Sequence, residues 1–89
     1  MKELNFNFAL KDLSGNEIPD SNAGKLLASL LSNDNGKNPA KFWAWAQEFY
    51  GGQTVKIDNQ DLDLLKTLVT DSQQLTALSK AQILEVINK

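Results

Sequence analysis

The chain has 89 residues, which is enough for one domain over residues 1–89 and too few for two stable cores. Nine lysines and eleven carboxylates give a net charge of −2, and the chain contains no His, no Cys and no Arg. The missing residue types exclude a disulfide framework, a thiolate nucleophile, a Ser–His–Asp triad and guanidinium contacts to phosphate.

The first predicted element is a strand over Leu4–Lys11. Its large apolar side chains occupy every second position, the pattern of a half-buried strand: Leu4, Phe6, Phe8 and Leu10. Ser14-Gly15-Asn16 predicts a turn, because Gly and Asn accept positive φ. A short returning strand at Glu17–Ile18 is expected to end at Pro19, which cannot donate to a ladder.

Two helices are expected next. Asp20-Ser21-Asn22 offers N-cap oxygens, and the apolar side chains that follow share an arc of about 140° on a helical wheel: Ala23, Leu26, Leu27, Leu30 and Leu31. The polar segment 33–38 predicts a surface turn, since the spacing of a calcium loop fails there at both ends. A second helix is predicted over Pro39–Tyr50, with Gly51-Gly52 as its left-handed cap.

The second half of the chain predicts one strand and two more helices. Val55–Ile57 is the strand, with its two apolar side chains on one face. Asp58 should cap a third helix that reaches about Thr70. The last helix is introduced by the capping-box spacing of Ser79-Lys80-Ala81-Gln82, or begins as early as Leu75.

This order of elements predicts a mostly helical α+β fold. Two strands so far apart in the sequence are useful only if they pair, so Val55–Ile57 is placed beside Leu4–Leu10. The simplest arrangement is a small two- or three-stranded antiparallel sheet packed against about four short helices. An all-helical bundle with one flanking ribbon is the alternative.

The aromatic residues are concentrated in the second predicted helix, where five of the seven lie between positions 42 and 50. With Ala46 they occupy an arc of about 160°, wider than the roughly 100° of an ordinary surface helix. In the interpretation that we favour, the whole helix is the hub of the core. In the alternative, Trp43 and Tyr50 lie one heptad apart on a face that anchors a partner, because Trp and Tyr are common at binding hot spots.

The densest carboxylate cluster is Asp58, Asp61 and Asp63. Negative charge in the first turn of a helix is favoured by the helix dipole, so capping explains these residues better than a metal site or acid–base chemistry. On a helical wheel Asp63 lies about 160° from Asp61, which prevents the two from converging on one ion. We therefore assign no catalytic, metal-binding or cofactor-binding residue.

Charge and hydropathy also predict which partners are absent. The lysines are scattered singly, whereas a nucleic acid requires a basic face, so we expect no nucleic-acid partner. No apolar run approaches the roughly 18 residues that cross a bilayer, and no segment resembles a signal peptide. We expect a cytoplasmic protein with no membrane partner, and no small-molecule substrate or cofactor is evident.

Four segments carry a resemblance to a known group of proteins: Phe8–Ile18, Asn22–Ala28, Phe42-x-x-Trp45-Ala46 and Lys80–Glu85. The chain resembles small uncharacterised proteins encoded in phages and prophages of gut Bacteroides-type bacteria. The resemblance implies a role in virion assembly, where short acidic helical proteins act as tail or head chaperones. It implies no catalytic or binding residues.

Three functional hypotheses remain. The first is a non-enzymatic interaction module that presents Trp43 and Tyr50 to another protein or to a second copy of itself. The second is a regulator that accepts a partner strand along the edge of Leu4–Leu10. The least expected is a metal-dependent enzyme built on carboxylates, which would need a concave pocket where carboxylates from separate elements converge, for example Glu17 or Glu48 near Asp58.

Overall fold

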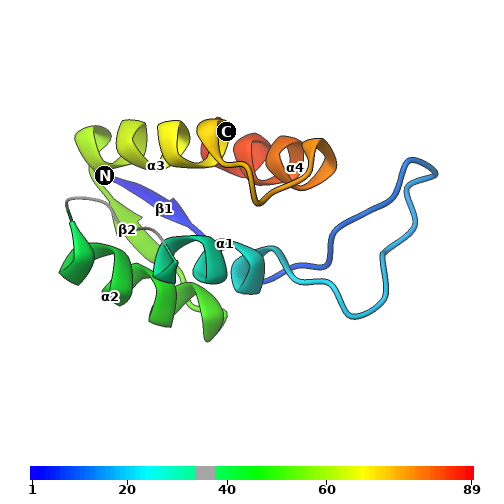
Figure 1. Cartoon of the computed structure of the whole chain (residues 1–89), viewed down its shortest axis with the longest axis horizontal. Coiled ribbons are helices and arrows are strands. Elements are labelled where there is room, and N and C mark those ends of the chain that lie inside the picture. The colour runs from blue at the N-terminus through cyan, green and yellow to red at the C-terminus, as the bar shows by residue number, and fades with distance from the viewer. Residues whose placement is uncertain (34–37) are drawn as a thin grey trace.

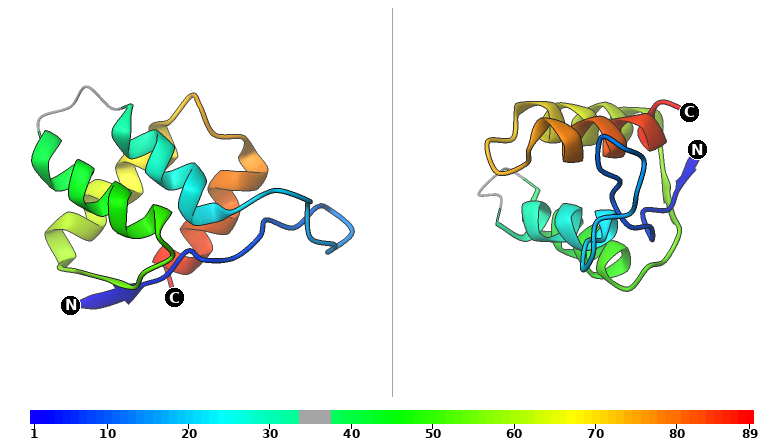
Figure 2. Two further views of the ribbon diagram at one scale, coloured as in Figure 1. Left: turned by 90° about the horizontal axis from the view of Figure 1, so that it is seen from below. Right: turned by 90° about the vertical axis from the view of Figure 1, so that its right-hand side faces the viewer.

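The computed structural model describes residues 1–33 and 38–89. The elements in these residues are Lys2–Leu4 (β1), Ala23–Ser32 (α1), Pro39–Tyr50 (α2), Val55–Ile57 (β2), Asn59–Asp71 (α3) and Ala77–Ile87 (α4). Helices α1 and α2 form one layer, α3 and α4 form another, and the strands close one side between them (Figures 1 and 2). The predicted α+β class is confirmed, with a two-stranded antiparallel sheet. The predicted turn over residues 33–38 lies mostly outside the described residues.

The strands β1 and β2 pair in the predicted way. They are antiparallel, with Leu4 opposite Val55 and Lys2 opposite Ile57. The Lys2 ammonium also donates to the backbone carbonyls of Ile87 and Lys89, which ties β1 to the end of α4. The C-terminal end of α4 therefore lies beside β1 (Figure 2).

The predicted strand over Leu4–Lys11 is wrong beyond Leu4, where β1 ends. The backbone that follows is hydrogen-bonded to the start of α1 and not to another strand. The Phe6 carbonyl accepts the Gly24 N–H at 2.8 Å, and the Phe8 carbonyl accepts the Ala23 N–H at 2.9 Å. The first N–H groups of a helix have no partner within the helix, so these bonds cap α1. The predicted alternation of side chains persists, because Leu4 and Phe6 are buried.

Residues 11–20 form a hairpin arm that projects along the long axis of the molecule (Figure 1). The predicted returning strand at Glu17–Ile18 is reduced to a single bridge between Lys11 and Glu17. At the tip, the Asp12 carboxylate accepts the backbone N–H groups of Ser14 at 2.9 Å and Asn16 at 3.0 Å. Gly15 has φ 87°, as the turn prediction requires.

The base of the hairpin arm is bonded to α4 by one side chain. The amide of Gln82 accepts the Lys11 N–H at 2.9 Å and donates to the Lys11 carbonyl at 2.8 Å. This pair of bonds satisfies both polar backbone groups of Lys11, much as a strand neighbour would. The arm is therefore held at a defined angle to the helices.

The helix starts follow the predictions at α1, α2 and α3, and α4 begins at Ala77, close to the earlier of its two predicted starts. Asn22 caps α1, and Asp58 caps α3 by accepting the Asp61 N–H at 2.8 Å. The predicted capping box at Ser79 is wrong, because Ser79 lies within α4 and Thr76 is the N-cap. At the end of α2, the left-handed residue is Gly52, with φ 78°.

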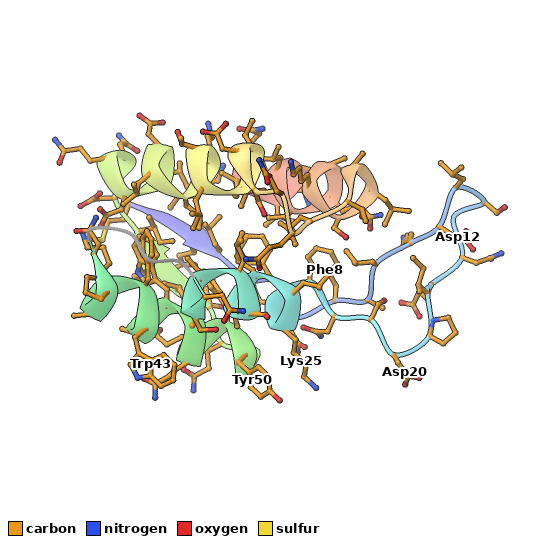
Figure 3. The ribbon with its side chains drawn as sticks, viewed as in Figure 1. Phe8, Asp12, Asp20, Lys25, Trp43 and Tyr50 are labelled. Carbon is orange, nitrogen blue, oxygen red and sulfur yellow. The ribbon has the colours of Figure 1, made fainter. Side chains whose placement is uncertain are left out.

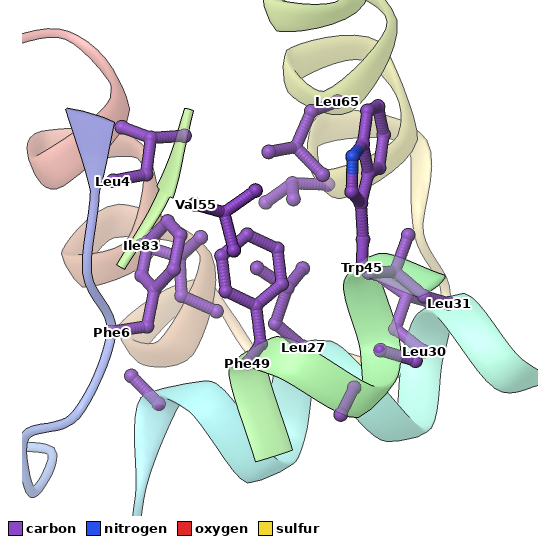
Figure 4. Packing of buried hydrophobic residues seen from close by; sticks show 14 of the residues in the cluster. Leu4, Phe6, Leu27, Leu30, Leu31, Trp45, Phe49, Val55, Leu65 and Ile83 are labelled. Carbon is purple, nitrogen blue, oxygen red and sulfur yellow. The ribbon is translucent and has the colours of Figure 1, made fainter. Parts of the chain in front are cut away.

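The core lies between the two helical layers and takes side chains from every element (Figure 4). The rings of Phe6 and Phe49 meet edge to face, with centroids 5.1 Å apart. Leu27 of α1, Leu65 of α3 and Ile83 of α4 are fully buried around them. Phe49 therefore anchors the inner face of α2 in the core, and the outer face of the same helix is left for other contacts.

Candidate functional site

Helix α2 divides its aromatic side chains between two faces. Phe42, Trp45 and Phe49 are buried, whereas Trp43 is 58% exposed and Tyr50 is 62% exposed. The interpretation of the whole aromatic helix as a core hub is therefore wrong for Trp43 and Tyr50. The physical reason is that α2 belongs to an outer layer, so the far side of its wide aromatic arc meets water (Figure 3).

Trp43 and Tyr50 border a groove of about 480 Å³ between α1 and α2. The side chains of Ala28 and Ala46 are buried in its floor, and small residues there leave the hollow that larger ones would fill. The remaining residues of the wall are polar or charged: Lys25, Ser29, Ser32 and Gln47. We call this feature the α1/α2 groove.

One end of the α1/α2 groove carries a positive charge. The Lys25 ammonium lies 5.5 Å from the centroid of the Tyr50 ring, within the range of a cation–π contact. In contrast, the Lys41 ammonium elsewhere on α2 is paired with the Asp61 carboxylate at 2.8 Å. Among the residues that the structure describes, no carboxylate lines the α1/α2 groove. The groove is thus apolar along its floor and positive at the Tyr50 end.

Gly24 sets the close approach that brings Lys25 to Tyr50. A Cβ atom at position 24 would lie 2.5 Å from the backbone oxygen of Phe49 and 3.3 Å from that of Phe6. Real side chains do not tolerate the first distance, so the start of α1 can lie against the end of α2 only because residue 24 is glycine. Gly24 is therefore a positioning residue for this end of the groove.

The α1 half of the groove was not predicted from the sequence. Lys25, Ser29 and Ser32 are spaced so that they share one helical face, which is a signal that the sequence does contain. Their spacing does not show which element lies beside that face. Only the packing of α1 on α2 places them opposite Trp43 and Tyr50.

Two carboxylates of the predicted cluster, Asp58 and Asp61, are used for helix capping and ion pairing. Asp58 caps α3, Asp61 pairs with Lys41, and Asp63 is exposed. Glu17 belongs to the hairpin arm, and Glu48 belongs to α2. Within residues 1–33 and 38–89, no group of three or more Asp, Glu, His or Cys side chains is placed to hold a metal ion.

The edge offered by β1 is short. The strand contains three residues, and the carbonyls of Phe6 and Phe8 just beyond it are bonded to the start of α1. Strand addition would require a continuous strand edge over Leu4–Leu10. The backbone does not form one, because β1 ends at Leu4.

Comparisons of the chain with protein-family models, with curated proteins and with solved structures find no match. In the described part of the chain, none of the helices has both the length and the apolar character required to cross a membrane.

Proposed function

We propose that the protein is a non-enzymatic interaction module that binds a protein partner in the α1/α2 groove, with Trp43 and Tyr50 as the anchors. One observation carries this proposal: two large aromatic side chains, each more than half exposed, border the same apolar groove. Trp and Tyr dominate the binding energy of many interfaces, and such anchors insert into or beside preformed pockets.

The expected binding energy supports anchors of this kind. Covering the exposed part of a Trp or Tyr removes on the order of 100 Å² of largely apolar surface from water, which contributes about 2–3 kcal/mol. The helix that carries both Trp43 and Tyr50, α2, is held by the core through its buried face, so little conformational entropy is lost on binding. A small interface centred on these two side chains can therefore give a specific, reversible complex.

The resemblance to phage and prophage proteins makes virion assembly the setting in which we expect this partner. Strand addition at the N-terminal strand is the less supported alternative, since β1 is only three residues long. An enzymatic role has the least support, because the chain has no His, Cys or Arg and the carboxylates at the helix starts act as caps and ion-pair partners.

Site-specific photo-cross-linking tests the proposal directly. A photoreactive phenylalanine analogue replaces Trp43 in one variant and the exposed Gln60 of α3 in a matched control variant. Both variants are expressed in the native host cells and irradiated there. We expect a defined protein adduct from position 43 that is absent from position 60. The same background adducts from both positions would contradict the proposed docking surface.

A double substitution provides a second test of the same proposal. Trp43→Ala with Tyr50→Ala should weaken binding of the cross-linked partner at least tenfold. Because both side chains are more than half exposed, the circular dichroism spectrum should stay that of the unsubstituted protein. Unfolding of the double variant, or full retention of binding, would show that these side chains are not docking anchors.

A further inference from the structure

We propose that the α1/α2 groove binds the hairpin arm of a second copy of this chain, with Leu13 inserted between Trp43 and Tyr50. The inference rests on the proposed function and names its partner. The Leu13 side chain is fully exposed to solvent. A leucine side chain with its flanking backbone fits within a groove of about 480 Å³ whose floor is formed by two alanines.

The hairpin arm is prepared for such a contact before it binds. Asp12 holds the turn through two backbone N–H groups, and Gln82 holds both polar groups of the Lys11 backbone at the base. Leu13 is therefore presented on a fixed loop. A preorganised loop loses little conformational entropy when it binds. Most of the free energy gained by burying the Leu13 side chain is therefore available as binding free energy.

Charge complementarity favours this arm as the occupant. Residues 11–20 carry Asp12, Glu17 and Asp20 against the single positive charge of Lys11, and these four side chains are exposed. The groove presents the Lys25 ammonium, with no carboxylate among the described residues that line it. An acidic loop with an apolar tip thus matches an apolar groove with a positive end.

The position of the two surfaces requires a second molecule. Figure 3 shows Asp12 of the arm at one extreme of the long axis, directed away from Trp43 and Tyr50 on the helical layer. Because the arm and the groove are different surfaces, each molecule can use both at once. The contact is therefore heterologous and joins molecules head to tail, into a ring or an open chain.

Complementation between two variants tests this arrangement. Leu13→Asp disables the arm and leaves the groove, while Trp43→Ala disables the groove and leaves the arm. In light scattering at protein concentrations up to about 1 mM, where contacts of this size are detected, the unsubstituted protein should increase in mass with concentration. Each variant alone should stay monomeric, and an equimolar mixture should form a one-to-one dimer that grows no further.

Two further variants control for folding and charge. Leu13→Met keeps an apolar tip and should retain assembly, whereas Lys25→Glu leaves Trp43 in place and should reduce assembly at least fivefold. Added salt should reduce the assembly of the unsubstituted protein, because the charges are near the surface.

A monomer at every concentration, or self-association of Leu13→Asp equal to that of the unsubstituted protein, would overturn the inference. A cross-linked partner at position 43 with no self-association would leave the proposed function standing and remove only this inference.

Discussion

Gly24 is the residue whose identity matters most for the shape of the α1/α2 groove. We predict that Gly24→Ala destabilises the protein by about 1–3 kcal/mol, because the added methyl group forces α1 away from the Phe49 carbonyl. Gly51→Ala is the matched control: a Cβ atom there has its nearest neighbour at 3.5 Å, and its φ of −78° is ordinary. Urea unfolding of both variants measures the difference, and equal stabilities would contradict the role given to Gly24.

At the same scale, the sequence could show that Trp43 and Tyr50 share a face but not whether that face is buried. Burial depends on whether another element covers the outer side of α2. Here α1 lies beside α2 and not over Trp43, so the aromatic face that sequence patterning assigned to the core is more than half exposed at two of its positions.

At the scale of elements, the start of α4 distinguishes the true cap from the predicted one. Thr76 accepts the Ser79 N–H at 3.2 Å, so Thr76→Ala should cost about 1 kcal/mol of stability. Thr67→Ala, an exposed position within α3, should cost nothing, because Ala has the higher helix propensity. Thermal unfolding that ranks the two variants in the opposite order would contradict the cap assignment.

The first strand shows what alternation in a sequence does and does not predict. The period-2 pattern over Leu4–Leu10 indicated which side chains face the core, since Leu4, Phe6 and Leu10 are buried and Phe8 is partly buried against the same cluster. It did not indicate the backbone hydrogen bonds. Alternating burial requires only an extended chain, whereas a strand also requires a neighbour, and the neighbour of Phe6 and Phe8 is the start of α1.

Helices α1, α2 and α3 and strand β2 were predicted well, because the signals that define them are local in the sequence. Pro39 and the glycines after Tyr50 define both ends of α2, and Asp58 defines the start of α3, within a few residues of sequence. The α1/α2 groove could not be predicted in this way. It depends on the contact of Gly24 with Phe49, which lie far apart in the chain.

At the scale of the whole molecule, the residues that stabilise the fold are different from those that we propose to bind a partner. One hydrophobic cluster between the helical layers takes side chains from every element, and it leaves outside it both the outer face of α2 and the tip of the hairpin arm. Substitutions at these outer positions should therefore change binding without changing the fold, while substitutions in the cluster should change both.

The most direct test of the docking surface is the fluorescence of Trp43 as the sole tryptophan, in a Trp45→Phe protein. Acrylamide should quench Trp43 readily in the dilute monomer, because this side chain is 58% exposed. Quenching should fall several-fold, with a blue shift of the emission, when the protein enters its complex, whether with a second copy or with the partner cross-linked at position 43. A Trp43 that is protected in the monomer, or that stays equally quenchable in the complex, would contradict the account.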